Sequence, residues 1–167
     1  ATPPAHAGDC IWGSFDGTRI NYANGPLTGA AHVTLRGVIE SNGGTIGATT
    51  GTLTAAYLGG VDVFYTSLLS LSSGVLSIDE QAALAAWVDG GGTLIVSADY
   101  FPTEAFDSFL APFGGASFSQ VNSWDPATPG AAHALTDGVS SIAVGGPIAT
   151  TAVPDDGALL ASNALGS

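Results

Sequence analysis

Short runs of apolar and β-branched residues alternate with stretches of helical periodicity along the first two thirds of the chain. Such runs, when turn residues bound them, are typical of strands in a sheet. The run Thr93–Ser97 is apolar at consecutive positions, so we expect it to be buried on both faces. The sequence therefore predicts strands over Cys10–Phe15, Thr45–Thr49, Val61–Thr66 and Thr93–Ser97.

A helix is expected between the first two strands, beginning at Thr28 as its cap and ending at Asn42-Gly43-Gly44. A short helix should run from Thr54 to Leu58 and stop at Gly59. The apolar positions expected on the packed face of the first of these helices are Val33, Leu35, Val38 and Ile39.

The clearest helix begins at Ser77, which forms a capping box with Glu80, and ends at Gly90-Gly91-Gly92. Its inward side is expected to carry Ile78, Leu84, Trp87 and Val88. A further helix is predicted over Thr103–Leu110, with Phe106, Phe109 and Leu110 inward. Beyond residue 116 the pattern fades, and only Ser140–Val144 and Ala158–Ser162 suggest strands.

Strands and helices in this order predict βαβ units and a mostly parallel sheet with helices on both faces. The fold class expected is a three-layer, flavodoxin-like α/β sandwich whose C-terminal part is irregular or incomplete. Residues 1–9 are interpreted as a flexible mature N-terminus, and residues 10–167 as a single α/β domain that is either whole or truncated at its C-terminus.

The charge balance limits the choice of partners. The 167 residues include fourteen acids and two basic residues, Arg19 and Arg36, which gives a net charge of −12. Phosphate backbones and anionic membranes require Lys and Arg, so nucleic acid and membrane surfaces are excluded as partners. Cationic partners or calcium ions would be attracted instead, and the acids would otherwise serve as a solvated surface.

The composition points to an exported bacterial protein, because Gly, Ala, Ser and Thr are abundant while only 10% of residues are charged. The longest apolar run, Ala82–Val88, is too short to cross a bilayer. Cys10 is the only cysteine, so it forms no internal disulfide. It is either a buried small hydrophobic residue or the partner of a cysteine in another chain.

The central part of the sequence resembles a known superfamily. The strand Val61–Ser67, the stretch Leu76–Val88 and the strand Gly91–Ser97 resemble the recurrent unit of class I glutamine amidotransferase-like domains, including secreted and trehalose-utilisation-type members. The segment His133–Val139 is similar to a later motif of that superfamily. The resemblance covers roughly residues 11–160 and implies a flavodoxin-like fold.

Two departures from the superfamily pattern bear on function. Catalytic members carry a cysteine on a tight G-x-C-x-G turn after the strand that corresponds to Leu94–Ser97, whereas this chain continues with Ala98, Asp99 and Tyr100. Relatives also continue with further strands beyond Leu160. The chain is therefore a fragment, a processed product, or a domain whose open sheet edge pairs with another chain, which is self or a different protein.

Ligands of open parallel sheets bind at the carboxyl ends of the strands, where the strand order reverses. The alternative at these ends is that Asp16 and Asp99 only cap turns and neighbouring helices. The candidate ligand cleft consists of Asp16, Gly17, Thr18, Thr66, Ser67, Ser97, Asp99 and Tyr100.

Other chemistry has weaker sequence signals. A Ser-His-Asp hydrolase could combine Ser67 or Ser97 with His133 and Asp99, but no G-x-S-x-G motif exposes a nucleophile. Trp124 is a candidate for carbohydrate contact. Asp155 and Asp156 are candidates for a calcium site, against the alternative of a solvated turn. The sequence predicts no other metal or cofactor.

Three functions follow from these observations. The first is a non-catalytic extracellular binding or assembly module on an amidotransferase-like scaffold, because the nucleophile of the superfamily is absent. The second is a secreted hydrolase with a Ser/Asp cleft at the strand ends. The third is a building block of an extracellular filament that grows through sheet edges.

Overall fold

A computed structural model describes the chain in two compact units, Ala1–Ser97 and Ala98–Ser167. Each unit is considered by itself. The structure describes residues 10–21, 25–97, 103–115, 118–120, 126–130, 137–138, 140–141, 148–150 and 161–162. The expected N-terminal segment 1–9 lies outside these residues, and the single domain over residues 10–167 stays a prediction.

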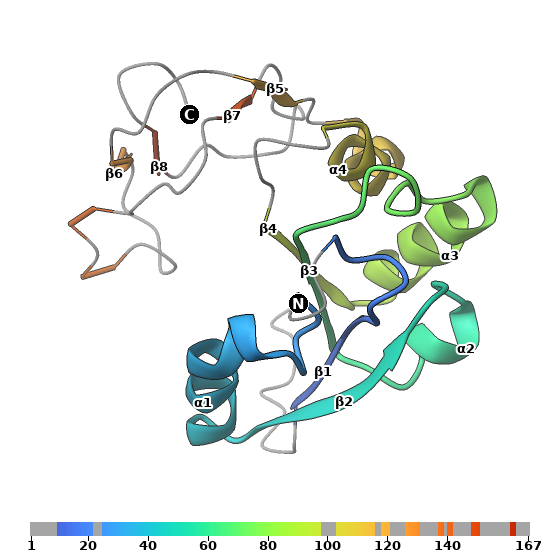
Figure 1. Cartoon of the computed structure of the whole chain (residues 1–167), viewed down its shortest axis with the longest axis horizontal. Coiled ribbons are helices and arrows are strands. Elements are labelled where there is room, and N and C mark those ends of the chain that lie inside the picture. The colour runs from blue at the N-terminus through green and yellow to red at the C-terminus, as the bar shows by residue number, and fades with distance from the viewer. Residues whose placement is uncertain are drawn as a thin grey trace. The chain divides into compact units, whose positions relative to one another are not determined.

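The first unit is built on a parallel sheet of the order β2-β1-β3-β4 (Figure 1). Residues Trp12 and Ser14 of β1 pair with β2 on one side and with β3 on the other. Strand β4 follows β3 in register up to the pair Ser67 and Ser97. The strands are β1 (Cys10–Phe15), β2 (Gly44–Thr50), β3 (Val63–Ser67) and β4 (Thr93–Ser97), which confirms all four predicted strands within two residues at each end.

Helices cover both faces of this sheet, as the predicted three-layer sandwich requires (Figure 1). Side chains alternate between the two faces along β1. Tyr57 packs against Gly13 on one face, and Ile39 approaches Trp12 next to Gly44 on the other. The helices of this unit are η1 (Ala30–His32), α1 (Val33–Ser41), α2 (Ala55–Leu58) and α3 (Ile78–Asp89). The predicted α/β fold class is confirmed.

Local capping signals fix the ends of two helices. The capping box at the start of α3 is present, with Ser77 Oγ accepting from the Glu80 amide and the Glu80 carboxylate accepting from the Ser77 amide. Thr54 caps α2 by accepting from the Tyr57 amide. The expected Thr28 cap of the first helix is wrong: η1 begins after Gly29 without a side-chain cap, and α1 follows His32.

Burial contradicts several expected packing positions. Val33 and Val38 of α1 are 61% and 55% exposed, and Ile39 is the buried one. Ile78 of α3 is 83% exposed, because it is the first residue of the helix and lies outside the stripe that contains Leu84. Strand β4 alternates between exposed and half-buried residues instead of being buried on both faces, since β3 is its one paired neighbour among the described residues.

The second unit contains short elements. Helix α4 (Thr103–Leu110) is present as predicted, with Phe106 and Phe109 fully buried and Leu110 half-buried. It is followed by η2 (Ala111–Phe113). Two antiparallel pairs join β5 (Phe118–Gln120) to β7 (Ile148–Thr150) and β6 (Thr128–Pro129) to β8 (Ala161–Ser162). Of the strand predicted over Ala158–Ser162, the structure describes these last two residues.

Candidate functional site

The strand order reverses between β1 and β3, which places a topological switch point at the carboxyl ends of these two strands. From β1 the chain moves outward to β2 and then returns to the other side of β1 to form β3. Crevices at such reversals are the usual ligand sites of open α/β sheets. Asp16 directly follows β1, and Ser67 is the last residue of β3. The structure therefore places these two predicted site residues at the switch point.

Ser67 lies against a histidine at this point. Its Oγ is 3.1 Å from Nε2 of His32, and both residues are buried, with 5% and 9% of their surfaces exposed. On the other side of the imidazole, Nδ1 is 3.2 Å from the carbonyl oxygen of Pro26. Because a carbonyl oxygen can only accept, Nδ1 carries the proton. In the neutral imidazole Nε2 then has a lone pair directed toward Ser67.

Tyr65 shares this acceptor. Its hydroxyl lies 3.2 Å from His32 Nε2, and the two rings meet edge to face. Tyr65 and Ser67 are two positions apart on β3, so their side chains leave the same face of the sheet. The hydroxyl groups of Tyr65 and Ser67 thus compete for the lone pair of His32 Nε2, and either one can donate a hydrogen bond to it.

The segment that carries His32 is held by side chains of neighbouring elements. Ser14 Oγ of β1 accepts from the Leu27 amide at 3.3 Å. Arg36 of α1 donates to the carbonyls of Leu27 and Gly29, the first at 2.7 Å. These contacts fix both the position of the imidazole and the Pro26 carbonyl that orients it.

The predicted residues after β1 form a closed turn. Asp16 Oδ1 accepts from the Thr18 amide at 2.8 Å and from the Thr18 hydroxyl at 2.5 Å. The turn-capping role expected as the alternative for Asp16 is therefore confirmed. Neither arginine of the chain pairs with Asp16, because Arg19 is bound to Glu80 and Arg36 to backbone carbonyls. Its carboxylate is a fixed negative charge at the switch point without an arginine partner.

The remaining predicted site residues have different fates. Thr66 is 1% exposed, and its hydroxyl has no hydrogen-bond partner in the described part of the chain. Ser97 lies opposite Ser67 on β4 and is exposed. The structure brings neither of them to His32. Asp99, Tyr100, Trp124, His133, Asp155 and Asp156 lie outside the described residues.

His32 is the residue that sequence reasoning missed. The hydrolase alternative gave the histidine role to His133 because of its motif. A usable signal existed, since His32 lies in the connection that follows the first strand, and this connection must cross the carboxyl edge of the sheet. Searching that connection for polar residues would have found it.

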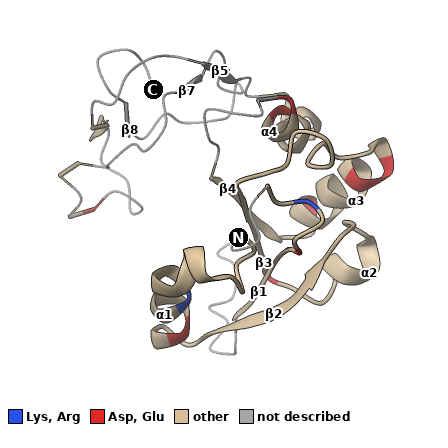
Figure 2. Cartoon of the chain, in the orientation of Figure 1, with Lys and Arg blue, Asp and Glu red and all other residues tan. Residues whose placement is uncertain are grey.

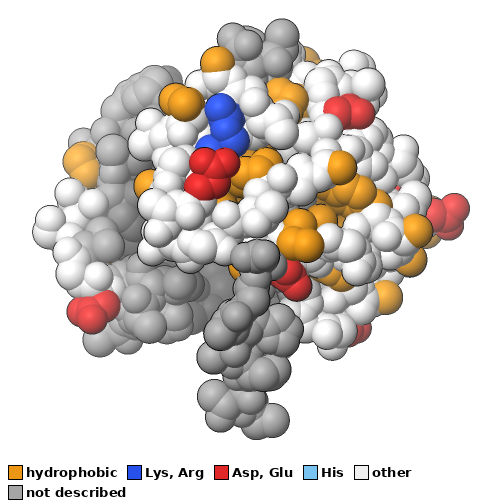
Figure 3. Space-filling model, turned by 90° about the horizontal axis from the view of Figure 1, so that it is seen from below, with side chains coloured by type: hydrophobic (Ala, Val, Ile, Leu, Met, Phe, Trp, Pro, Cys, Tyr) orange, Lys and Arg blue, Asp and Glu red, His pale blue; other side chains and the backbone are white. Residues whose placement is uncertain are grey.

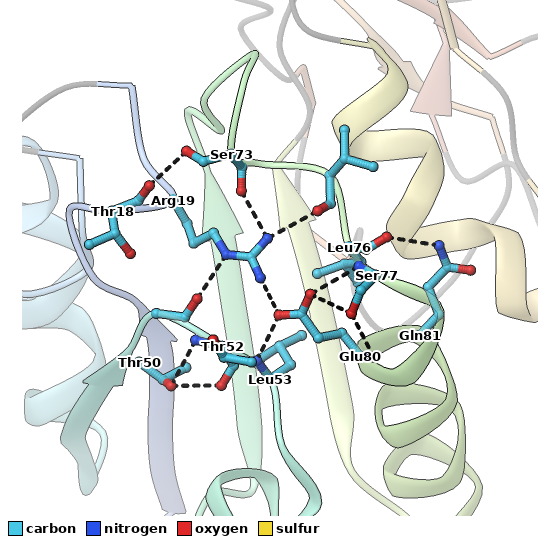
Figure 4. Close-up of polar contacts among 12 residues, drawn as sticks. Thr18, Arg19, Thr50, Thr52, Leu53, Ser73, Leu76, Ser77, Glu80 and Gln81 are labelled. Carbon is cyan, nitrogen blue, oxygen red and sulfur yellow. Dashed lines mark hydrogen bonds and ion pairs between the residues drawn. The ribbon is translucent and has the colours of Figure 1, made fainter.

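A second polar cluster fixes the loops around the switch point (Figure 4). Arg19 Nη2 pairs with Glu80, while its other nitrogens donate to the carbonyls of Gly51, Ser73 and Val75 at 2.8 to 3.0 Å. The Glu80 carboxylate also accepts from the amides of Leu53 and Ser77. The pair thereby joins the loops after β1, β2 and β3 to the start of α3.

The environment of Glu80 predicts acid sensitivity. Burial raises the pKa of this carboxyl, but the Arg19 guanidinium and the amides of Ser77 and Leu53 outweigh burial and hold it below its ordinary value of 4.5. The unfolded chain therefore binds more protons, so the stability that Glu80 contributes is present above pH 4.5 and is lost as the pH falls through the lower folded pKa.

We expect the urea concentration at the midpoint of unfolding to decrease as the pH is lowered from about 6 to about 3. The decrease should be smaller in the Glu80→Gln variant, because this variant has no carboxyl at position 80 to protonate. Asp89→Asn removes an exposed acid of the same helix and serves as the control. If the midpoint decreased equally with pH in the wild type and in Glu80→Gln, Glu80 would not be the cause of the acid sensitivity.

The described residues also line a cavity at the opposite edge of the sheet. Its volume is about 650 Å³, and Cys10, Asp62, Trp87 and Thr93 contribute to its wall. Cys10 is half-buried and forms no disulfide. Burial and the nearby Asp62 carboxylate raise the pKa of its thiol. Cys10 is the first residue of β1, so it lies at the opposite end of this strand from the switch point.

Two other kinds of site are not found in the described part of the chain. Among the described residues, no group of three or more His, Cys, Asp or Glu side chains is placed to hold a metal ion. None of the helices that the structure describes is long and apolar enough to span a membrane.

Basic side chains occur in two places of the first unit, after β1 and in α1 (Figure 2), and the face in Figure 3 carries scattered acids.

Comparison with known proteins supports the fold. The chain is similar to the crystal structure of a protein of Thermoplasma acidophilum that is described as a GMP synthase subunit, with a TM-score of 0.58 and 15% identity over 95% of this chain and 75% of the other. No protein-family model matches the sequence, and no curated protein matches it. At this identity the likeness shows the flavodoxin-like α/β fold alone.

Proposed function

We propose that the domain is an extracellular binding module that holds a small uncharged or cationic molecule at the carboxyl ends of β1 and β3. The observation that carries the proposal is the gathering of buried polar side chains, with Asp16 beside them, where the strand order reverses. Secretion rests on composition alone, and the choice of ligand does not depend on it.

The charge of the ligand is argued from the arginines. Anionic ligands are normally held by Arg or Lys, which supply several donors and a positive charge. Both arginines of this chain already donate to backbone carbonyls, and Arg19 is also neutralised by Glu80. With Asp16 at the switch point and a net charge of −12, the local and the long-range fields both favour a neutral or cationic ligand.

Amide chemical shifts measured with choline, glucose and acetate as probes test this proposal. We expect choline or glucose to shift the amides of residues 16–18 and 66–67, and acetate to leave them unchanged. The Asp16→Asn variant should bind choline up to about fivefold more weakly, as removal of a partly exposed charge pair predicts. Asp89→Asn, which removes an exposed acid far along α3, should bind it normally. A response to acetate alone, or to none of the probes, would contradict the proposal.

A second candidate is assembly through the sheet edge. Among the described residues β4 pairs with β3 alone, and its Ile95 is exposed. Exposed edge strands can accept a strand from another chain, of the same or a different protein. Sedimentation at several concentrations tests this candidate: mass that grows with concentration supports it, and a constant monomer mass contradicts it.

A further inference from the structure

We propose that Ser67 is a nucleophile with His32 as its general base, so that the site at the switch point converts small acyl compounds, namely esters or activated amides. This proposal rests on the proposed ligand site and adds a reaction to it. It places the reaction at the end of β3. The amidotransferase-like resemblance would place a nucleophile after β4, where this sequence has no cysteine.

The arrangement contains each part that an activated serine requires. A nucleophile needs a base within hydrogen-bond reach, and the base needs a third group that fixes its tautomer. Ser67 Oγ lies 3.1 Å from Nε2 of His32, and the Pro26 carbonyl lies 3.2 Å from Nδ1. The carbonyl occupies the position that a carboxylate has in a Ser-His-Asp triad. Here it orients the imidazole without adding a charge.

The backbone turns sharply beside the nucleophile. Leu68, which directly follows Ser67, has a φ of +53° in the left-handed region that residues other than glycine seldom adopt. Its carbonyl accepts from the Asn21 amide at 2.8 Å, and the next residue, Leu69, bridges to Ile20. Strain of this kind persists where the surroundings hold it and is concentrated at functional sites. Ser67 therefore lies at a constrained turn at the end of a strand.

Burial restricts the substrate. Ser67 and His32 are 5% and 9% exposed, so the proposed reaction requires an acyl group compact enough to approach a buried hydroxyl. The buried surroundings also strengthen the hydrogen bond between them relative to water. Together with the charge argument above, this selects small neutral or cationic esters.

The reaction balances with water as the second substrate. Ser67 Oγ attacks the carbonyl carbon of the ester while its proton moves to His32 Nε2, and the leaving alcohol departs with that proton. Water then attacks the acyl-serine, gives a proton to Nε2, and the carboxylic acid is released as Ser67 Oγ regains its proton. No oxidant, metal or other reactant is required.

A purely structural role makes a different prediction. His32 would then only attach the segment around Pro26 to β3, and the serine hydroxyl would be no more reactive than others. Tyr65 separates the two roles, because its hydroxyl competes with Ser67 for Nε2. If His32 activates Ser67, Tyr65→Phe leaves the Nε2 lone pair to Ser67 alone and increases the rate of Ser67 acylation. If His32 has only a structural role, Tyr65→Phe removes one of its hydrogen bonds and does not increase that rate.

The experiment uses the full chain with Cys10→Ala, so that the only thiol does not react. The protein is incubated with p-nitrophenyl acetate, release of p-nitrophenolate is followed, and the acetylated residue is located by mass spectrometry of peptides. We expect one acetyl group on Ser67, its loss in Ser67→Ala, and a rate at least about 100-fold lower in His32→Gln, as removal of a general base predicts.

Ser41→Ala is the control, since Ser41 is an exposed serine at the end of α1 and belongs to no candidate site. It should react like the parent. Circular dichroism of every variant verifies folding. If Ser67→Ala is poorly folded, Ser67→Cys replaces it, and we expect this variant to be acylated at position 67. Acetylation that persists in Ser67→Ala, or that Ser41→Ala reduces equally, would overturn the proposal. Shifts with choline or glucose but no acetylation would overturn it while leaving the binding proposal intact. Acetylation of Ser67 without those chemical-shift changes would support the nucleophile and contradict the binding proposal.

Discussion

Replacing Arg19 with methionine is expected to lower the free energy of unfolding by about 3–5 kcal/mol, the range for breaking a buried ion pair from one side. The Glu80 side chain is 5% exposed, so without Arg19 its carboxylate would remain buried without its positive partner. The carbonyls of Gly51, Ser73 and Val75 would lose a donor at the same time. Urea unfolding at neutral pH measures this loss.

Two further variants show whether the charge of Glu80 causes the loss. Arg36→Met is the control, because Arg36 donates to backbone carbonyls in the same unit and, among the described residues, no hydrogen bond joins it to an acid. We expect it to cost clearly less than Arg19→Met. In the Arg19→Met background, Glu80→Gln should recover part of the stability, since an amide oxygen can still accept from Leu53 and Ser77 without a buried charge. An equal cost for both arginines would contradict this account.

Most of the fold of the first unit is predictable because its signals are local. The β-branched and apolar run before Ser67 and the capping box at Ser77 each determine structure within a few residues, and both are observed. The burial of Glu80 is different, because it depends on Arg19, which lies 61 residues earlier in the chain. Periodicity therefore predicted that Ile78 faces inward, whereas in the structure Ile78 is exposed and Glu80 is buried.

The candidate site divides in the same way. The positions of Asp16 and Ser67 follow from strand order, because residues after parallel strands meet at one edge of the sheet. The contact of Ser67 with His32 requires the path of the connection around Pro26, which depends on Ser14 and Arg36. No short motif encodes this path. The expectation of a non-catalytic module rested on the missing cysteine after the strand that ends at Ser97, and the hydrolase alternative combined Ser67 with His133 rather than with His32.

Gly13→Ala is expected to lower the free energy of unfolding by about 1–3 kcal/mol, as overpacking of a filled interior does. A Cβ at Gly13 would lie 2.6 Å from the Tyr57 hydroxyl and 2.9 Å from Val61 Cγ1. The register between β1 and β2 shifts at this glycine, and the Tyr57 hydroxyl accepts from the Ser14 amide and donates to the Ala48 carbonyl there. Burial raises the pKa of Tyr57, so this hydroxyl keeps the proton it donates.

A double-mutant cycle with Tyr57→Phe separates the two contacts of the new methyl group. Without the hydroxyl, Gly13→Ala should cost less, and the difference measures the clash with Tyr57; an unchanged cost would assign the loss to Val61 instead. Gly37→Ala is the matched control, because Gly37 is exposed within α1 and a Cβ there meets nothing within 4 Å. It should stabilise the protein by about 0.5–1 kcal/mol through helix propensity. Opposite signs for the same chemical change would show that the contact at β1 and Tyr57, rather than the loss of glycine, decides the outcome.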